Sequence, residues 1–148
     1  MEILTTHKDY KIKFERKQTY LGQSTNQYIN KITFFNNIGI KILDINLSNS
    51  DIKFILNQLY DFIELNTTYI QIKLYPSNTT GESYTLEIDD KTVAGGVYSL
   101  FTLLNNNLNL IKISFYFDIE FLILFIVCLY DFIKTDPDNA YYDPSFIL

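Results

Sequence analysis

The chain carries one pattern of sequence twice. Four short segments recur in the same order, at offsets of 67 to 71 residues, so the two copies differ by small insertions. Because both copies repeat the same order of apolar and polar positions, they predict one structural unit used twice. The matching pairs are 33–37 with 102–106, 40–42 with 111–113, 51–54 with 118–121, and 59–63 with 129–133.

Each copy has strand patterns followed by a helix pattern. Alternating apolar residues predict half-buried strands at Tyr10–Phe14, Tyr28–Phe35 and Ile38–Leu47, with a polar loop over Gln18–Gln27. The alternation changes phase once inside the third strand, which predicts a β-bulge near Leu43.

Two helices are expected, one at the end of each copy. Ser48 and Asp51 form a capping pattern, and the apolar residues that follow, at positions 52, 55, 56, 59, 62 and 63, share one helix face. Asp118 caps the second helix. The strands between the helices are Tyr69–Tyr75, Tyr84–Asp89, Val97–Leu104 and Leu110–Phe117. The spacing in Val97–Leu104 suits a helix or a strand, and its counterpart Tyr28–Phe35 favours a strand.

These elements predict an α+β fold: a largely antiparallel sheet of about seven strands, with two helices packed on one face, from a tandem βββα duplication. The length of 148 residues is that of a single domain. Its parts are pseudo-repeat 1 (10–66), a linking strand (69–75), pseudo-repeat 2 (83–135) and a tail (136–148).

Charge is unevenly distributed. Residues 1–45 have a balance of +3, and the remaining residues have a balance of −8. An acidic body repels phosphate, so we expect no direct nucleic-acid binding, whereas a basic protein partner is attracted.

The expected location is the cytoplasm, without a membrane segment. The N-terminus lacks the basic and apolar regions of a signal peptide, and the single cysteine, Cys128, fits a reducing compartment. The uncharged apolar run Phe121–Tyr130 is shorter than the roughly 20 residues of a membrane span, so it predicts a buried helix.

Few residues offer catalytic or metal chemistry. His7 is the only histidine, Cys128 lies inside an apolar helix, and Gly95-Gly96 lacks the lysine of a phosphate loop. Asp136 and Asp138 with Asp143 lack the spacing of a calcium loop. We therefore expect no enzyme activity, no cofactor and no metal.

The two helices differ on the side away from the apolar stripe. The first has Phe54, Asn57, Gln58 and Asp61 there, and the second has Phe121, Leu124, Phe125 and Cys128. A helix that is apolar all round must be covered on both faces. The cover is the sheet with the first helix, the tail 141–148 folded back, or a second copy or foreign partner, which would make a homodimer through the second helix possible.

In size, acidic charge and fold type, the chain resembles the small acidic immunity proteins of bacterial toxin–immunity systems (contact-dependent inhibition or polymorphic toxins). The resemblance implies a non-catalytic toxin inhibitor that neutralises a cognate toxin, most often a nuclease, by occluding its basic surface. Two alternatives remain: a phage-type inhibitor of a host defence protein, and an enzyme or small-ligand binder with a site between the repeats, near Tyr69–Tyr75.

A partner-binding surface should combine carboxylates with tyrosines. The tail is the first candidate, and the first helix and the strand Tyr84–Asp89 with its following residue are the second. The tail can also simply cover the core. The candidate residues are Asp136, Asp138, Tyr141, Tyr142 and Asp143 in the tail, Asp61 and Glu64 on the helix, and Glu87, Asp89 and Asp90 on the strand.

Overall fold

The computed structural model describes residues 1–21, 25–76, 82–93, 96–135 and 142–146. The first copy contains β1 (Glu2–Leu4), β2 (Tyr10–Leu21), β3 (Thr25–Asn36), β4 (Lys41–Leu47) and α1 (Asn49–Glu64). The second contains β5 (Tyr69–Leu74), β6 (Tyr84–Val93), β7 (Gly96–Asn105), β8 (Leu110–Phe117) and α2 (Ile119–Ile133), followed by the 3-10 turn η2 (Pro144–Phe146).

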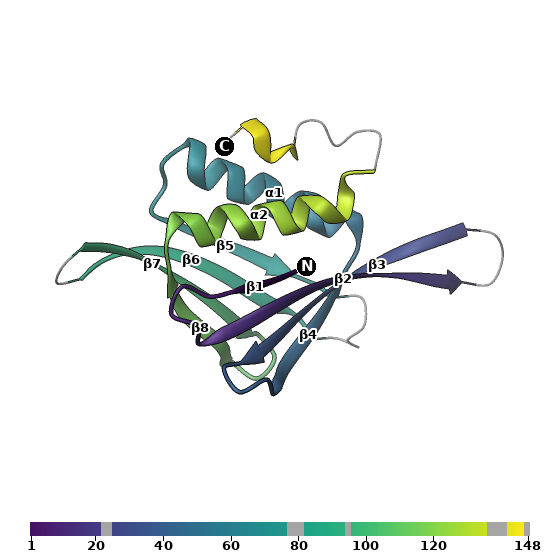
Figure 1. The fold of residues 1–148 in the computed structure, drawn as a ribbon, viewed down its shortest axis with the longest axis horizontal. Helices are drawn as coiled ribbons and strands as arrows, with labels where there is room; N and C mark the ends of the chain where they lie inside the picture. Colours follow the sequence, from purple (N-terminus) through teal and green to yellow (C-terminus); the bar gives the residue numbers. More distant parts are fainter. Residues whose placement is uncertain (22–24, 77–81, 94–95, 136–141, 147–148) are drawn as a thin grey trace.

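The strands in the described residues form two antiparallel four-stranded sheets. Sheet A has the order β1-β2-β3-β4 and sheet B the order β5-β6-β7-β8 (Figure 1). The predicted α+β class, antiparallel pairing, two helices and duplication are confirmed. The predicted linking strand is β5, an edge strand of sheet B, and β1 has the same place in sheet A. Each copy is thus four strands and a helix.

The bulge shows how closely the copies correspond. In sheet A the register shifts between Phe34 and Phe35, where β3 pairs with β4. In sheet B it shifts between Leu103 and Leu104, at the equivalent place on β7. The bulge predicted near Leu43 is therefore confirmed, and it is present in both copies. The ambiguous segment Val97–Leu104 lies in β7, as the repeat predicted.

The helix starts are also as predicted. The Ser48 hydroxyl accepts a hydrogen bond from the Asp51 backbone N–H at 3.2 Å, and the Asp51 carboxylate accepts one from the Ser48 N–H at 3.1 Å. This reciprocal capping satisfies two backbone donors that a helix start leaves open. At α2 the Asp118 carboxylate accepts from the Phe121 N–H at 2.9 Å.

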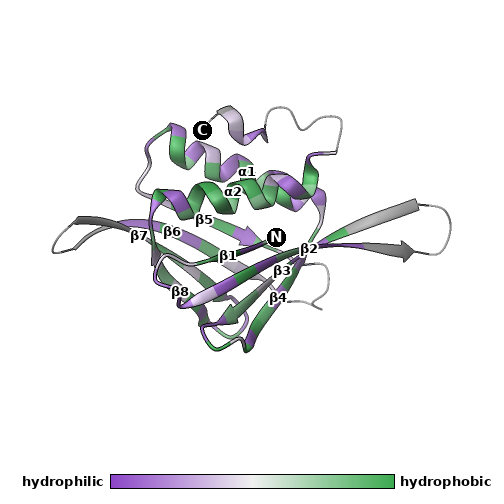
Figure 2. Cartoon of the chain, in the orientation of Figure 1, coloured by the Kyte–Doolittle hydropathy of each residue, from purple (hydrophilic) through white to green (hydrophobic). Residues whose placement is uncertain are grey.

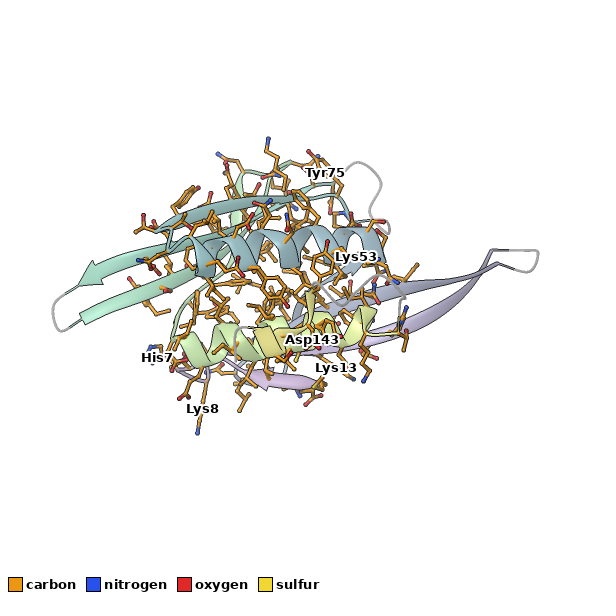
Figure 3. All side chains as sticks on the ribbon, turned by 90° about the horizontal axis from the view of Figure 1, so that it is seen from above. His7, Lys8, Lys13, Lys53, Tyr75 and Asp143 are labelled. Carbon is orange, nitrogen blue, oxygen red and sulfur yellow. The ribbon has the colours of Figure 1, made fainter. Side chains whose placement is uncertain are left out.

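Each helix contacts both copies. Seen from above, α1 lies along sheet B and α2 along sheet A, with Lys13 on the side of α2 and Tyr75 on the side of α1 (Figure 3). α1 contacts β5 of the second copy and also β3 and β4 of the first. α2 contacts β2 of the first copy, and its aromatic rings also pack on β7 and β8 of the second. The buried residues of both sheets and both helices form one hydrophobic cluster.

The covering of α2 is largely internal. Phe14 of β2 lies 5.7 Å from Phe125 and 5.9 Å from Phe132 between ring centroids, while Phe115 of β8 lies 5.2 Å from Phe121. The helix therefore contacts both sheets, with α1 and η2 beside it, and Figure 2 shows it as mostly hydrophobic. Ile119 and Leu124 are exceptions, at 58% and 49% exposed.

The loop predicted over Gln18–Gln27 is wrong for residues 18–21 and 25–27, and residues 22–24 lie outside the described residues. Residues 18–21 belong to β2 and 25–27 to β3, and the pairing continues from Lys17–Ile29 to Leu21–Thr25. Backbone pairing between antiparallel strands needs no apolar alternation, so this polar sequence forms strands. The ends of β2 and β3 project from the body on one side, and those of β6 and β7 project on the other (Figure 1).

Candidate functional site

The outward side of sheet A is rich in lysine, and its charges are paired. Lys11, Lys13 and Glu15 of β2 share this side with Lys31 of β3 and with Lys41 and Asp44 of β4. The ion pairs Lys11–Glu2, Lys13–Glu15 and Lys31–Asp44 each measure 3.5 Å, and Lys41–Asp44 measures 3.2 Å. Burial acts to raise the pKa of Asp44, but the two ammonium groups outweigh it and lower the pKa.

The same side of sheet B has a different composition. On each of β2, β3 and β4, three outward-facing residues can be matched, through the strand pairing, with three residues on β6, β7 and β8. At these positions sheet A has four lysines and two carboxylates, whereas sheet B has two carboxylates, Glu87 and Asp89, and no lysine. The net charge of these nine positions is thus +2 in sheet A and −2 in sheet B, while Lys73 of the edge strand β5 adds one lysine to this side of sheet B.

One row of sheet B shows the change most clearly. Tyr69, Asp89, Leu100 and Tyr116 lie directly opposite one another across the four strands. The equivalent row of sheet A is Glu15–Lys31–Asn46. The carboxylate is kept, the lysine facing it has become leucine, and Lys13, which pairs with Glu15 in sheet A, is Glu87 in sheet B. Tyr69 and Tyr116 are 48% and 40% exposed.

The polar groups of this face are held by neutral partners. The Gln71 Nε2 donates to the Glu87 carboxylate at 3.3 Å, and the Tyr69 hydroxyl also bonds to Glu87. Partial burial, and then the carboxylates of Glu87 and Asp89, raise the pKa of Tyr69, so its phenol stays protonated and can donate.

The predicted carboxylates of α1 are not part of this face. Asp61 and Glu64 are in the last turns of α1, which packs on β5, and Tyr69 begins β5 just after the helix ends. α1 packs on the buried side of the sheets, whereas Glu87 and Asp89 are on the outward side of sheet B, and we call Glu87 and Asp89, with Tyr69 beside them, the acidic patch. Asp90 follows Asp89 but is on the opposite side of the sheet, where Ser99 donates a hydrogen bond to its carboxylate.

The tail residues have a packing role in the structure. Tyr60 of α1 donates its hydroxyl to the Tyr142 carbonyl, and the two rings stack with centroids 6.4 Å apart. Burial, followed by the charge of Asp143, raises the pKa of Tyr60. Asp143 itself accepts from the Ser145 N–H at 3.0 Å. Asp136, Asp138 and Tyr141 lie outside the described residues, so their predicted partner contacts stay predictions.

The groups that catalysis would need do not come together. His7 is exposed in the β1–β2 turn, while Cys128 is buried in α2, 3.9 Å from the Met1 sulfur. Burial raises the pKa of the Cys128 thiol to about 11. Among the described residues no group of three His, Cys, Asp or Glu side chains could hold a metal ion. In the same part of the chain, no helix has the length and apolarity for a membrane crossing.

A cavity of about 270 Å³ lies between the C-terminal end of α1, sheet B and the start of α2. It contains Asp90 and Ser99, and the connection to β5, residues 66–67, forms part of its wall. A second cavity of about 170 Å³ lies beside the β1–β2 and β3–β4 turns, near Lys8 and Lys11. The first is close to the place, near Tyr69, where the duplication suggested a site between the repeats.

No protein-family model and no characterised protein sequence matches the chain. Among solved structures, that of the plant transcriptional regulator PBF-2 is similar, with 12% identity over 99% of this chain and 93% of that chain, and a TM-score of 0.48.

Proposed function

We propose that the chain is a non-catalytic binding protein that neutralises a basic protein, in the manner of an immunity protein acting on a nuclease toxin. The acidic patch and the adjoining outer face of sheet B are the proposed contact surface. The supporting observation is the charge difference between equivalent positions of the two sheets: sheet A keeps four lysines where sheet B has none.

The chemistry of the surface suits such a partner. Glu87 and Asp89 supply charge that attracts and orients a basic protein, which mainly raises the association rate. Tyr69, Leu100 and Tyr116 supply the apolar and hydrogen-bonding area that anchors an interface. The homodimer predicted through the second helix stays a prediction, and Leu124 and Ile119 are its exposed apolar residues on α2.

The test uses the product of the adjacent reading frame, since toxin and immunity genes are expected side by side. We expect that product to contain a basic nuclease domain, and an equimolar amount of this chain to abolish its cleavage of nucleic acid. A neighbouring product that is not a toxin, or whose cleavage continues unchanged, would contradict the proposal.

Charge reversals locate the surface. Glu87→Lys with Asp89→Lys should slow association by about tenfold or more at low salt, because electrostatic steering is lost. The matched control is Glu2→Lys with Glu15→Lys, which reverses two carboxylates on the outer side of sheet A. A third variant, Asp136→Lys, Asp138→Lys and Asp143→Lys, tests the tail. If only the tail variant slowed association, the contact surface would be there instead.

A further inference from the structure

The cavity at the end of α1 combines apolar walls with one carboxylate. Phe62 and Ile63 of α1, Phe117 of β8 and Leu122 of α2 line it, together with Asp90 and Ser99. Its volume of about 270 Å³ is below the ~300–1,000 Å³ of pockets that take whole drug-sized ligands. A single extended side chain is an occupant of suitable size.

The Asp90 carboxylate is fixed in position. Its backbone N–H donates to the Thr68 carbonyl at 2.8 Å, and the Ser99 hydroxyl donates to one carboxylate oxygen. A carboxylate has about four acceptor sites, so this single hydroxyl leaves capacity for a further donor. Asp90 is half-buried, which strengthens its interaction with a cation beyond that of a fully solvated group.

The surrounding charges also favour a cation. The C-terminal end of α1 has negative dipole character, and its last turn contains no basic residue. The start of α2 has positive dipole character, but the Asp118 cap and Glu120 of the first turn add negative charge there. The α1 end of the cavity thus favours a positively charged ligand, and at the α2 end these two carboxylates offset the helix dipole.

The first copy has an arginine at the position of Asp90. Arg16 and Asn30 are paired across β2 and β3 as Asp90 and Ser99 are across β6 and β7. The first copy therefore carries its own guanidinium at this register position, and the second copy carries a carboxylate beside an open cavity.

We propose that this cavity is a socket for an arginine or lysine side chain of the basic partner, with Asp90 as its counter-ion. The inference rests on the proposed function for the identity of the partner. Phe62 and Phe117 provide aromatic surface for a guanidinium or an alkylammonium. Asp90 follows Asp89 in β6 but is on the other side of the sheet, so the socket is a contact separate from the acidic patch.

The first test titrates the full chain with N-acetyl-arginine methylamide, followed by the backbone amide resonances of Thr67, Ser99 and Phe117. The isosteric citrulline compound is the neutral control. We expect shifts of these resonances with the arginine compound and none with citrulline. Equal shifts with both, or shifts with neither, would overturn the socket.

Two variants and one control assign the binding to Asp90. Asp90→Asn keeps an acceptor for Ser99 but removes the charge, and it should weaken binding by about tenfold, or about 1.4 kcal/mol. Ile119→Trp narrows the cavity at an exposed position of its wall without changing charge, and it should abolish binding. Glu15→Gln removes an exposed carboxylate of sheet A and should have no effect. Unchanged binding in both cavity variants would overturn the assignment.

A peptide distinguishes a partner side chain from a free small cation. The peptide Gly-Gly-Arg-Gly-Gly should shift the same resonances, whereas binding of butylguanidinium alone would show that the socket does not accept a side chain on a polypeptide.

Partner inhibition separates the two proposals. If Asp90→Asn inhibits the toxin as well as the native chain and the arginine compound does not bind, the socket fails while the proposed function stands. If the arginine compound binds but no basic partner is neutralised, the proposed function fails.

Discussion

Phe125 and Leu124 are neighbours in α2 with opposite environments. The Phe125 ring lies 5.7 Å from both Phe14 of sheet A and Phe101 of sheet B, so it joins the two sheets through the helix. Phe125 is 2% exposed, while Leu124 is 49% exposed. At this scale, stability depends on which face of α2 a residue occupies rather than on its hydrophobicity.

Substitution of the two residues should therefore have unequal effects. Phe125→Ala should lower the free energy of unfolding by about 3–5 kcal/mol, because it removes a large ring and leaves a cavity. Leu124→Ala should change it by less than about 1 kcal/mol. Chemical denaturation of both variants measures the difference. The Phe125→Asp variant should unfold. If it stayed folded and only its oligomeric state changed, the side chains that cover this ring would belong to another molecule.

At the scale of elements, the tail is held on α1 by few contacts. One hydrogen bond and one ring stack join Tyr60 to Tyr142, and η2 also contacts α2. This short segment therefore rests on the helix pair by few interactions. Segments held in this way exchange their amide protons more readily than the core.

Tyr60→Phe should loosen the tail without unfolding the body. The variant keeps the ring but loses the hydroxyl that bonds to the Tyr142 carbonyl, a change of about 0.5–1.5 kcal/mol. We expect faster amide exchange at Asp143, Ser145 and Phe146 and unchanged exchange in β3 and β7. Tyr75→Phe, an exposed tyrosine after β5, is the control. Equal exchange of the tail in Tyr60→Phe and native protein would contradict the role of the hydroxyl.

The sequence predicted the helices and strands better than it predicted which side chains form one surface. Local patterns that the duplication supports predict four of these features: the helix caps at Ser48 and Asp118, the bulge near Leu43 and strand β7. The paired residues 18–21 and 25–27 were missed because backbone pairing holds them without apolar alternation. Asp89 was a candidate, but the row that joins it to Tyr69, Leu100 and Tyr116 depends on strand register, which the repeat alone does not give. Arg16 and Asp90 are recognised as equivalent positions of opposite charge only after the strands of the two copies are aligned.

At the scale of the molecule, the two copies interlock. α1 contacts β3 and β4 of the first copy and β5 of the second, α2 packs on β2 of the first copy and on β7 and β8 of the second, and the core is one cluster. Neither copy buries its inner side without the helix of the other. Cooperative unfolding of the whole chain follows, since loss of either copy exposes the core of the other.

A single copy should not fold as a monomer. The fragment 1–66 should lack a cooperative unfolding transition at low concentration, measured by circular dichroism with sizing chromatography, because the buried face of α1 has lost sheet B. Co-expression with the fragment 67–148 should restore the native transition, which serves as the control. A monomeric fragment 1–66 with a cooperative transition would show that the first copy buries its core without the second.

The packing of each helix against both copies also has an evolutionary consequence. An unfused ancestor with this arrangement would be a symmetric pair of identical chains, in which every substitution appears twice. After fusion, a substitution appears once, so one half can preserve the shared scaffold while the other diverges. Arginine at position 16 and aspartate at position 90 fit such a divergence: two identical chains would have to carry one charge at both places, whereas a fused chain can carry both.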